Sequence, residues 1–267
     1  MKIYFSIPIM LIMLLVAATS AQAHFQLIYT PESALQKPEK LQLRLIFTHP
    51  FDAGHTMDMP EPEEFYVLHK GQKTDLMQDL QPIKWQGAHN SGQAFATDYS
   101  LRGMGDWVFA LKPEPYYEEK EEVYIQQITK TVVNVKGLPT DWDTELGLKA
   151  EIVPLDKPYA LWTGNVFRGV VKADGQPVPN AQIEVEYLNH EPKIESDSFA
   201  KQAKVEAPQA AFETMTIKAN EHGEFSFGIP KAGWWGFCAL GVGPDDQYEG
   251  KELSQDAVIW VQARDME

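Results

Sequence analysis

The chain has 267 residues, a formal net charge of −15 and a hydrophobic share of 44%. A chain of this length and hydrophobicity can bury a core, which excludes global disorder, and the length suits two domains better than one. The negative charge disfavours binding to anionic partners, so we expect the protein to bind neither nucleic acid nor an anionic membrane surface.

The N-terminus has the pattern of a secretory signal peptide. Lys2 precedes an apolar run over Ile7–Ala18, and Ala21-Gln22-Ala23 fits the small-x-small pattern that signal peptidase recognises. A membrane anchor is the alternative, but the run is shorter than the about 20 residues that span a bilayer. We therefore expect cleavage before His24, export, and no direct membrane insertion after cleavage.

Strand patterns dominate the first half of the mature chain. Leu41–Phe47 and Val123–Val135 alternate apolar and polar residues, and a hairpin is predicted to turn at Lys70-Gly71-Gln72. The acidic stretch Pro113–Glu122 is predicted to be a solvated loop or a short helical turn. Little helical periodicity is present, so sandwiches or barrels are favoured.

The pattern changes around Pro154–Pro158. The second half has strands punctuated by turns such as Asp174-Gly175, a long polar excursion or mobile loop over His190–Pro208, and a last strand over Ala257–Arg264. We expect an all-β fold of two β-sandwich-like domains after a cleaved signal peptide. The predicted boundaries are residues 1–23 for the signal peptide, 24–157 for the N-terminal domain and 158–267 for the C-terminal domain.

Two apolar features of the second half have simple structural interpretations. The single cysteine, Cys238, lies in an apolar run and is predicted to be a buried, inert thiol; one cysteine cannot form an intramolecular disulfide or a cysteine-based metal site. In the pair Trp234-Trp235, strand alternation should send one ring into a core and the other to a domain interface.

No nucleophile, phosphate-loop, dinucleotide or HExxH motif is present, so we assign no catalytic residues. Candidate metal ligands are concentrated instead in the segment Phe47–Met59, at the end of the strand predicted over Leu41–Phe47. This segment holds the candidate ligands His49, His55 and Met57, with Asp52, Asp58 and Met59 nearby. Pro50 and Gly54 interrupt regular structure, which allows both imidazoles to turn toward one point. Imidazole suits nickel, cobalt, copper and zinc, and a thioether favours copper(I).

His24 becomes a further candidate ligand if cleavage occurs where predicted. Its α-amine titrates near pH ~8, so a metal ion can displace the amine proton at neutral pH. The amine and the imidazole of one residue would then chelate together. The alternative interpretation of each histidine is an ordinary polar loop residue, and Met57 and Met59 are also typical packing residues.

The chain resembles the DUF4198 family of exported bacterial proteins, which are associated with cobalt and nickel uptake in the periplasm. The resemblance lies in the Ala23–Phe25 start, in the segment THPFDAGHTMDMPEPEEF, and in the stretches TKTVVNV, EIVPLDKPY, GNVFRGVVKADGQPVPNAQIEVEY and HGEFSFGIPKAGWWGF. The second half also resembles a transthyretin-like or carboxypeptidase-regulatory-like β-sandwich, a scaffold that carries many functions.

This resemblance implies a periplasmic protein that binds nickel or cobalt and assists uptake, with a membrane metal transporter as partner. The ligand positions that match are His24, His49 and His55. A histidine as first residue is also similar to the histidine brace of copper proteins, so a copper protein or oxidase is one alternative. A metal-free cell-envelope adhesion or assembly module is the other.

Overall fold

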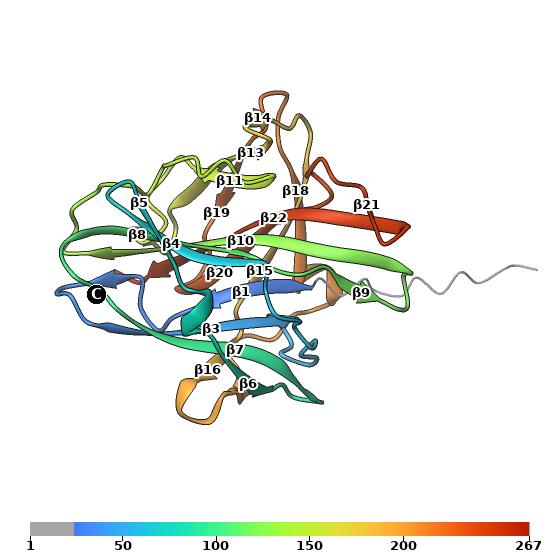
Figure 1. Cartoon of the computed structure of the whole chain (residues 1–267), viewed down its shortest axis with the longest axis horizontal. Helices are drawn as coiled ribbons and strands as arrows, with labels where there is room; N and C mark the ends of the chain where they lie inside the picture. Colours follow the sequence, from blue (N-terminus) through green and yellow to red (C-terminus); the bar gives the residue numbers. More distant parts are fainter. Residues whose placement is uncertain (1–23, 267) are drawn as a thin grey trace, which may run out of the picture.

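The computed structural model describes residues 24–266, so the signal peptide predicted over residues 1–23 lies outside the described residues. The described chain forms 22 β-strands and three short 3-10 helices without any α-helix, which confirms the all-β prediction. In this part of the chain no helix is long and apolar enough to cross a membrane. The strands form three sheets that pack into a sandwich-like fold (Figure 1).

The first sheet has six strands, most of them from the first half of the chain. In spatial order they are β1 (Phe25–Tyr29), β3 (Lys40–Thr48), β7 (Ser91–Ser100), β6 (Gln81–Gln86), β17 (Ser198–Ala203) and β16 (His190–Lys193). The last two come from the stretch predicted to be a long excursion or mobile loop. That prediction was wrong, because this stretch pairs with itself and with β6 through Ser198 and Gln86. A 3-10 helix, η2 (Ile194–Ser196), connects them.

The second sheet has twelve strands and runs through the middle of the molecule (Figure 1). Its main path is β18 (Thr214–Lys218), β15 (Gln182–Tyr187), β20 (Gly233–Ala239), β22 (Lys251–Arg264), β10 (Val123–Val135), β8 (Gly105–Lys112), β4 (Glu64–His69) and β5 (Gln72–Asp75). Short strands attach beside this path: β2 (Ala34–Leu35), β9 (Tyr116–Glu118), β12 (Leu161–Trp162) and β21 (Gln247–Tyr248).

The third sheet has four strands and covers the C-terminal part of the second sheet. It contains β11 (Ala150–Pro154), β13 (Val166–Ala173), β14 (Gln176–Pro177) and β19 (Glu224–Gly228). The predicted turn at Asp174-Gly175 connects β13 and β14, with φ of 44° at Asp174 and 75° at Gly175. The other 3-10 helices are η1 (Met77–Asp79) and η3 (Ala210–Phe212).

Several strand predictions agree closely with the structure. β10 has the predicted bounds Val123–Val135, and the β4–β5 hairpin turns through Lys70-Gly71. The last strand is longer than predicted, because β22 begins at Lys251. The acidic stretch is only partly a loop, since its residues Tyr116–Glu118 form β9 and pair with β10.

The two halves of the chain share a sheet. β10 from the first half and β22 from the second pair in parallel over eight residue pairs, from Tyr124 with Leu253 to Thr131 with Trp260. The division at residue 157 stays a prediction. The structure adds that a hydrogen-bonded sheet crosses it, so the halves are joined by backbone as well as by side chains.

The tryptophan pair illustrates how the two faces of this sheet are covered. Trp235 packs into the cluster between the second and third sheets, with Phe237 and Ile259. Trp234 points to the opposite face and joins a cluster that includes Phe25 and Leu27 from the first half. The predicted alternation is confirmed, and Cys238 is fully buried in the second of these clusters, also as predicted.

A buried ion pair connects the second and third sheets. Lys130 on β10 lies 2.7 Å from the Glu151 carboxylate on β11, and the two side chains are only 2% and 3% exposed. Glu151 also accepts hydrogen bonds from the backbone N–H groups of Leu146, Gly147 and Leu148. Burial lowers the pKa of Lys130, and the neighbouring Glu151 opposes that effect.

We predict that Lys130→Met lowers the free energy of unfolding by roughly 3 kcal/mol, because it leaves the Glu151 charge buried without its cation. Urea denaturation at pH 7 measures the change. The control is Lys84→Met at an exposed position of β6, where the expected change is within about 0.5 kcal/mol. Equal losses in the two variants would contradict the importance of the pair.

Candidate metal centre

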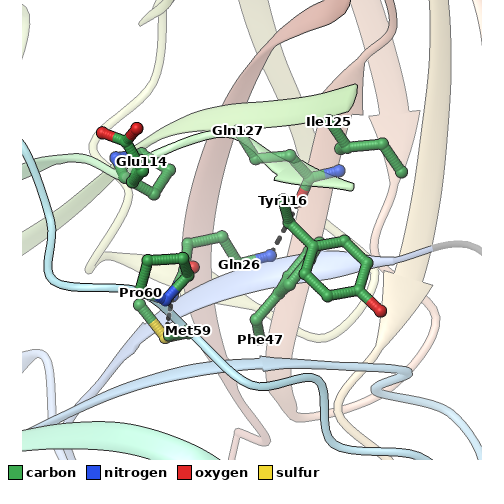
Figure 2. Close-up of a pocket in the computed structure, with 9 residues that line it drawn as sticks. Gln26, Phe47, Met59, Pro60, Glu114, Tyr116, Ile125 and Gln127 are labelled. Atoms are coloured by element: carbon green, nitrogen blue, oxygen red, sulfur yellow. Dashed lines mark hydrogen bonds between the residues drawn. The ribbon is translucent and has the colours of Figure 1, made fainter. Parts of the chain in front are cut away.

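His24 is held at the start of β1 by a side chain from the neighbouring sheet. On one side, Phe25 pairs with Thr48 at the end of β3. On the other, the Gln127 amide of β10 accepts a hydrogen bond from the Gln26 N–H at 2.7 Å and donates one to the His24 carbonyl at 2.7 Å. Figure 2 shows Gln127 reaching toward Gln26. The backbone at His24 is therefore fixed on both sides.

His49 is the first residue after β3, and the chain turns back sharply behind it. The Ala53 N–H donates to the His49 carbonyl at 2.9 Å, and the His49 N–H donates to the His55 carbonyl at 3.3 Å. The Thr48 hydroxyl also donates to that carbonyl, at 2.7 Å. A Cβ at Gly54 would lie 2.7 Å from the Asp52 carboxylate, so a larger residue there would require the Asp52 side chain to move.

The three predicted histidines come together at this turn. The His24 and His49 ring centroids are 4.8 Å apart with an interplanar angle of 79°, and those of His49 and His55 are 6.2 Å apart. His49 is 8% exposed, the His24 side chain 14%, and His55 is exposed. The cluster therefore extends from a buried ring to the surface. We call these three residues the histidine cluster.

His49 lacks hydrogen bonds that a buried imidazole normally makes. Neither Nδ1 nor Nε2 has a partner within the described residues, although both atoms are inaccessible to solvent. Burial, assisted by the neighbouring His24, lowers the pKa of His49 to about 4. The ring is therefore neutral at neutral pH, and its unshared electron pair is available to a metal ion.

His24 lies against an acidic strand. Its Nε2 is 3.2 Å from the Glu118 carboxylate on β9, and its ring lies near the rings of Phe47 and Tyr116 at 5.7 and 6.4 Å. Burial lowers the pKa of His24, while Glu118 and Glu121 oppose that effect. An apolar pocket adjoins the site, and Phe47 and Tyr116 form part of its lining (Figure 2).

The turn is anchored to the second half of the chain through Glu186 and Asn189. Glu186 on β15 accepts a hydrogen bond from the Phe51 N–H at 3.2 Å, and it lines a small cavity together with His49 and Asp52. Asn189 donates to the carbonyls of Pro50 and Phe51. Burial raises the pKa of Glu186 well above its usual range.

Sequence reasoning missed both carboxylates near the histidine cluster. In the sequence, Gln182–Tyr187 alternates polar and apolar residues, and this pattern predicts that Glu186 faces solvent. In the structure Glu186 is only 2% exposed because the turn after β3 covers it. Glu118 belonged to a stretch predicted to be solvated. The density of acidic residues there was a visible signal, but nothing in the sequence placed it beside His24.

Met57 lies in a hydrophobic core rather than beside an open coordination position. It is 1% exposed and belongs to the cluster that contains Leu43, Phe65 and Phe95. Its N–H donates to the Phe47 carbonyl. The structure therefore favours a packing role for the Met57 thioether over a role as metal ligand.

The histidine cluster is not yet in a coordinating geometry. Within residues 24–266, no three His, Cys, Asp or Glu side chains already converge at metal-binding distances. Coordination requires the rings of the cluster to rotate toward a common point. The unpaired nitrogens of His49 nevertheless fit a metal ion, because they are buried donors for which the described protein offers no hydrogen-bond partner.

Comparison with known families identifies one match. The model described as "Domain of unknown function (DUF4198)" matches residues 21–243 of the chain. A comparison with curated proteins finds no match.

Solved structures resemble the chain only remotely. The D0-D1 domain of intimin is 12% identical, with 90% of this chain and 100% of that chain covered and a TM-score of 0.23. The adhesin InvE of Yersinia pseudotuberculosis is 9% identical, with 90% and 59% covered and a TM-score of 0.25. The alpha-2-macroglobulin of E. coli is 11% identical, with 90% and 14% covered and a TM-score of 0.23.

We predict that acid destabilises the metal-free protein through His49. Its folded-state pKa of about 4 lies below the value of about 6.5 for an unfolded histidine, so the unfolded chain takes up the proton first. The stability contribution is present above pH ~6.5 and is lost as the pH falls toward 4, by about 3 kcal/mol at most.

Urea denaturation in the presence of a chelator, at several pH values between 7 and 4, measures this effect. His49→Asn should flatten the dependence relative to the wild type, whereas His222→Asn, at an exposed position, should keep the wild-type slope. Identical slopes in all three proteins would show that His49 is not held neutral in the folded state.

Proposed function

The chain belongs to the DUF4198 family, and on that premise we propose that it is a periplasmic protein that binds nickel or cobalt and assists uptake of the metal. The proposed ligands are His24, with its free α-amine after cleavage, together with His49 and His55. The metal is cargo that is bound and released, and no chemistry is performed on it.

The observation that carries this proposal is the pair of unpaired nitrogens on His49. A buried polar group without a partner costs about 1–3 kcal/mol. This ring has two such atoms within the described structure, and it lies between two other imidazoles. A divalent transition metal would satisfy one of them with a bond that imidazole forms readily.

The position of His24 supports the same interpretation. If cleavage follows Ala23, the α-amine and the imidazole belong to one residue whose carbonyl is already held by Gln127. A chelating residue with a fixed backbone loses little conformational freedom when it binds an ion. Burial also keeps His24 and His49 in the neutral form that metal binding needs, because it lowers the pKa of both.

Glu118 and His55 suggest how the cargo would enter and leave. Glu118 lies 3.2 Å from His24 Nε2, so its carboxylate can accept a hydrogen bond from the metal-free ring. When an ion is bound, the same carboxylate would offset part of the positive charge of that ion. His55 is the exposed member of the cluster and is accessible to a membrane transporter. Protonation of the imidazoles in acid would release the metal.

A copper protein is the second candidate, and one feature of the site favours it. An N-terminal amine with two imidazoles, from His24 and His49, is the nitrogen donor set of a histidine brace, and the two rings lie edge to face at 4.8 Å. Copper(II) also binds nitrogen sites more tightly than nickel or cobalt does. Ascorbate-driven peroxide production by the copper-loaded protein would favour this oxidase.

We predict that mature protein beginning at His24 binds about one nickel or cobalt ion per chain, and that His49→Asn or His55→Ala weakens the affinity at least tenfold. Isothermal titration calorimetry at pH 7.5 measures the affinity, and intact mass establishes the first residue. The matched control is His222→Asn, because the His222 side chain is exposed and lies beside Glu221, outside the histidine cluster.

Two outcomes would contradict the proposal. One is an affinity that is unchanged in both cluster variants, which would place the metal elsewhere. The other is a correctly cleaved protein that takes up no metal, which would favour a metal-free adhesion or assembly module instead.

A further inference from the structure

A second pocket lies between strands β4, β5 and β8 of the second sheet and the end of β7 in the first sheet. His69 is the last residue of β4 and Thr74 lies on β5, while Tyr99 lies near the end of β7 and Trp107 on β8. The cavity has a volume of about 370 Å³. None of its lining residues belongs to the histidine cluster, and this inference does not depend on the proposed metal function.

The aromatic side of the pocket is rigid. His69 stacks flat on Trp107, with ring centroids 3.7 Å apart and an interplanar angle of 3°, and Tyr99 meets Trp107 edge to face at 5.7 Å. The Asp106 carbonyl lies 2.7 Å from His69 Nδ1. A carbonyl only accepts, so Nδ1 carries a hydrogen and the other ring nitrogen, Nε2, is left for a ligand.

The β4–β5 turn beside the pocket is also held in place. The buried Asp141 carboxylate accepts hydrogen bonds from the N–H groups of Lys70 and Gly71 in the β4–β5 turn, at 2.7 and 2.9 Å. Both turn residues have positive φ, at 51° and 72°. A pocket whose walls are fixed before binding loses little conformational entropy when a ligand enters.

Two polar groups at the pocket lack partners in the described chain. Trp107 is 4% exposed, and its indole Nε1 is buried without a hydrogen-bond acceptor. Arg102 is exposed and forms no ion pair within residues 24–266, whereas Arg44, Arg168 and Arg264 each pair with a carboxylate. In a chain with a net charge of −15, an arginine that has no acidic partner and lines a cavity is available to an anion.

The lining indicates which anion would fit. A guanidinium binds a carboxylate through two parallel hydrogen bonds. Gln72, Thr74 and Ser100 add neutral hydrogen-bonding groups that match hydroxyls. The half-buried rings of His69 and Tyr99 offer an apolar surface for a sugar ring. A simple inorganic anion would leave these groups unused. We propose that this pocket binds a carboxylate-bearing sugar, with Arg102 on the carboxylate.

Nuclear magnetic resonance titrations of the metal-free mature protein test the proposal. The probes are D-glucuronate, D-glucose, which has the same ring without the carboxylate, and acetate, which has the carboxylate without the ring. Glucuronate should shift the Trp107 indole N–H resonance and bind at least tenfold more tightly than either of the other two, because a charge-assisted hydrogen bond and the hydroxyl contacts are both needed.

Two variants distinguish binding in this pocket from a general attraction of the anion to positive charge on the protein. Arg102→Gln should reduce the glucuronate affinity to that of glucose, whereas Lys84→Gln, which removes the same charge at an exposed position outside the pocket, should leave it unchanged. Equal affinities for glucuronate and acetate, an unchanged affinity in Arg102→Gln, or no shift at saturating glucuronate would each overturn the proposal.

Discussion

The fold and the site both depend on β10, a strand with polar side chains on two buried faces. Its backbone pairs with β8 on one side and in parallel with β22 on the other, which joins the two halves of the chain. Its side chains form the cross-layer contacts: Gln127 holds the start of β1, and Lys130 holds β11 through Glu151. Buried polar groups are tolerated only when they are paired, so these residues specify which strands lie against β10 and in which register.

The histidine cluster follows from this arrangement. β1 ends up beside β3 with Phe25 opposite Thr48, which places the residue before β1 next to the residue after β3. His24 and His49 are therefore neighbours because of strand pairing, although 25 positions separate them in the sequence. His55 joins them for a local reason, since the tight turn through Ala53 and Gly54 returns the chain to His49.

Local patterns predicted much of the fold, and their failures have a common cause. The alternation in β10 and the Lys70-Gly71 turn are short-range features, and both appear as expected. The stretch from His190 to Pro208 looked like a loop because its polar residues lack an apolar face; its strands form by pairing at the edge of the first sheet. Glu186 seemed solvent-facing for the same reason, as the element that covers it lies 135 residues away. The histidines could be recognised as ligand types, but their unpaired nitrogens could not.

The attachment of the His49 turn to Glu186 and Asn189 has a consequence for how such a protein can be divided or recombined. The histidines belong to the first half, while the groups that hold their turn belong to the second. If the second half were exchanged for that of a relative, the residues that hold the turn after His49 would be exchanged with it. A C-terminal half taken from a relative would therefore have to keep the contacts that Glu186 and Asn189 make with the turn after His49.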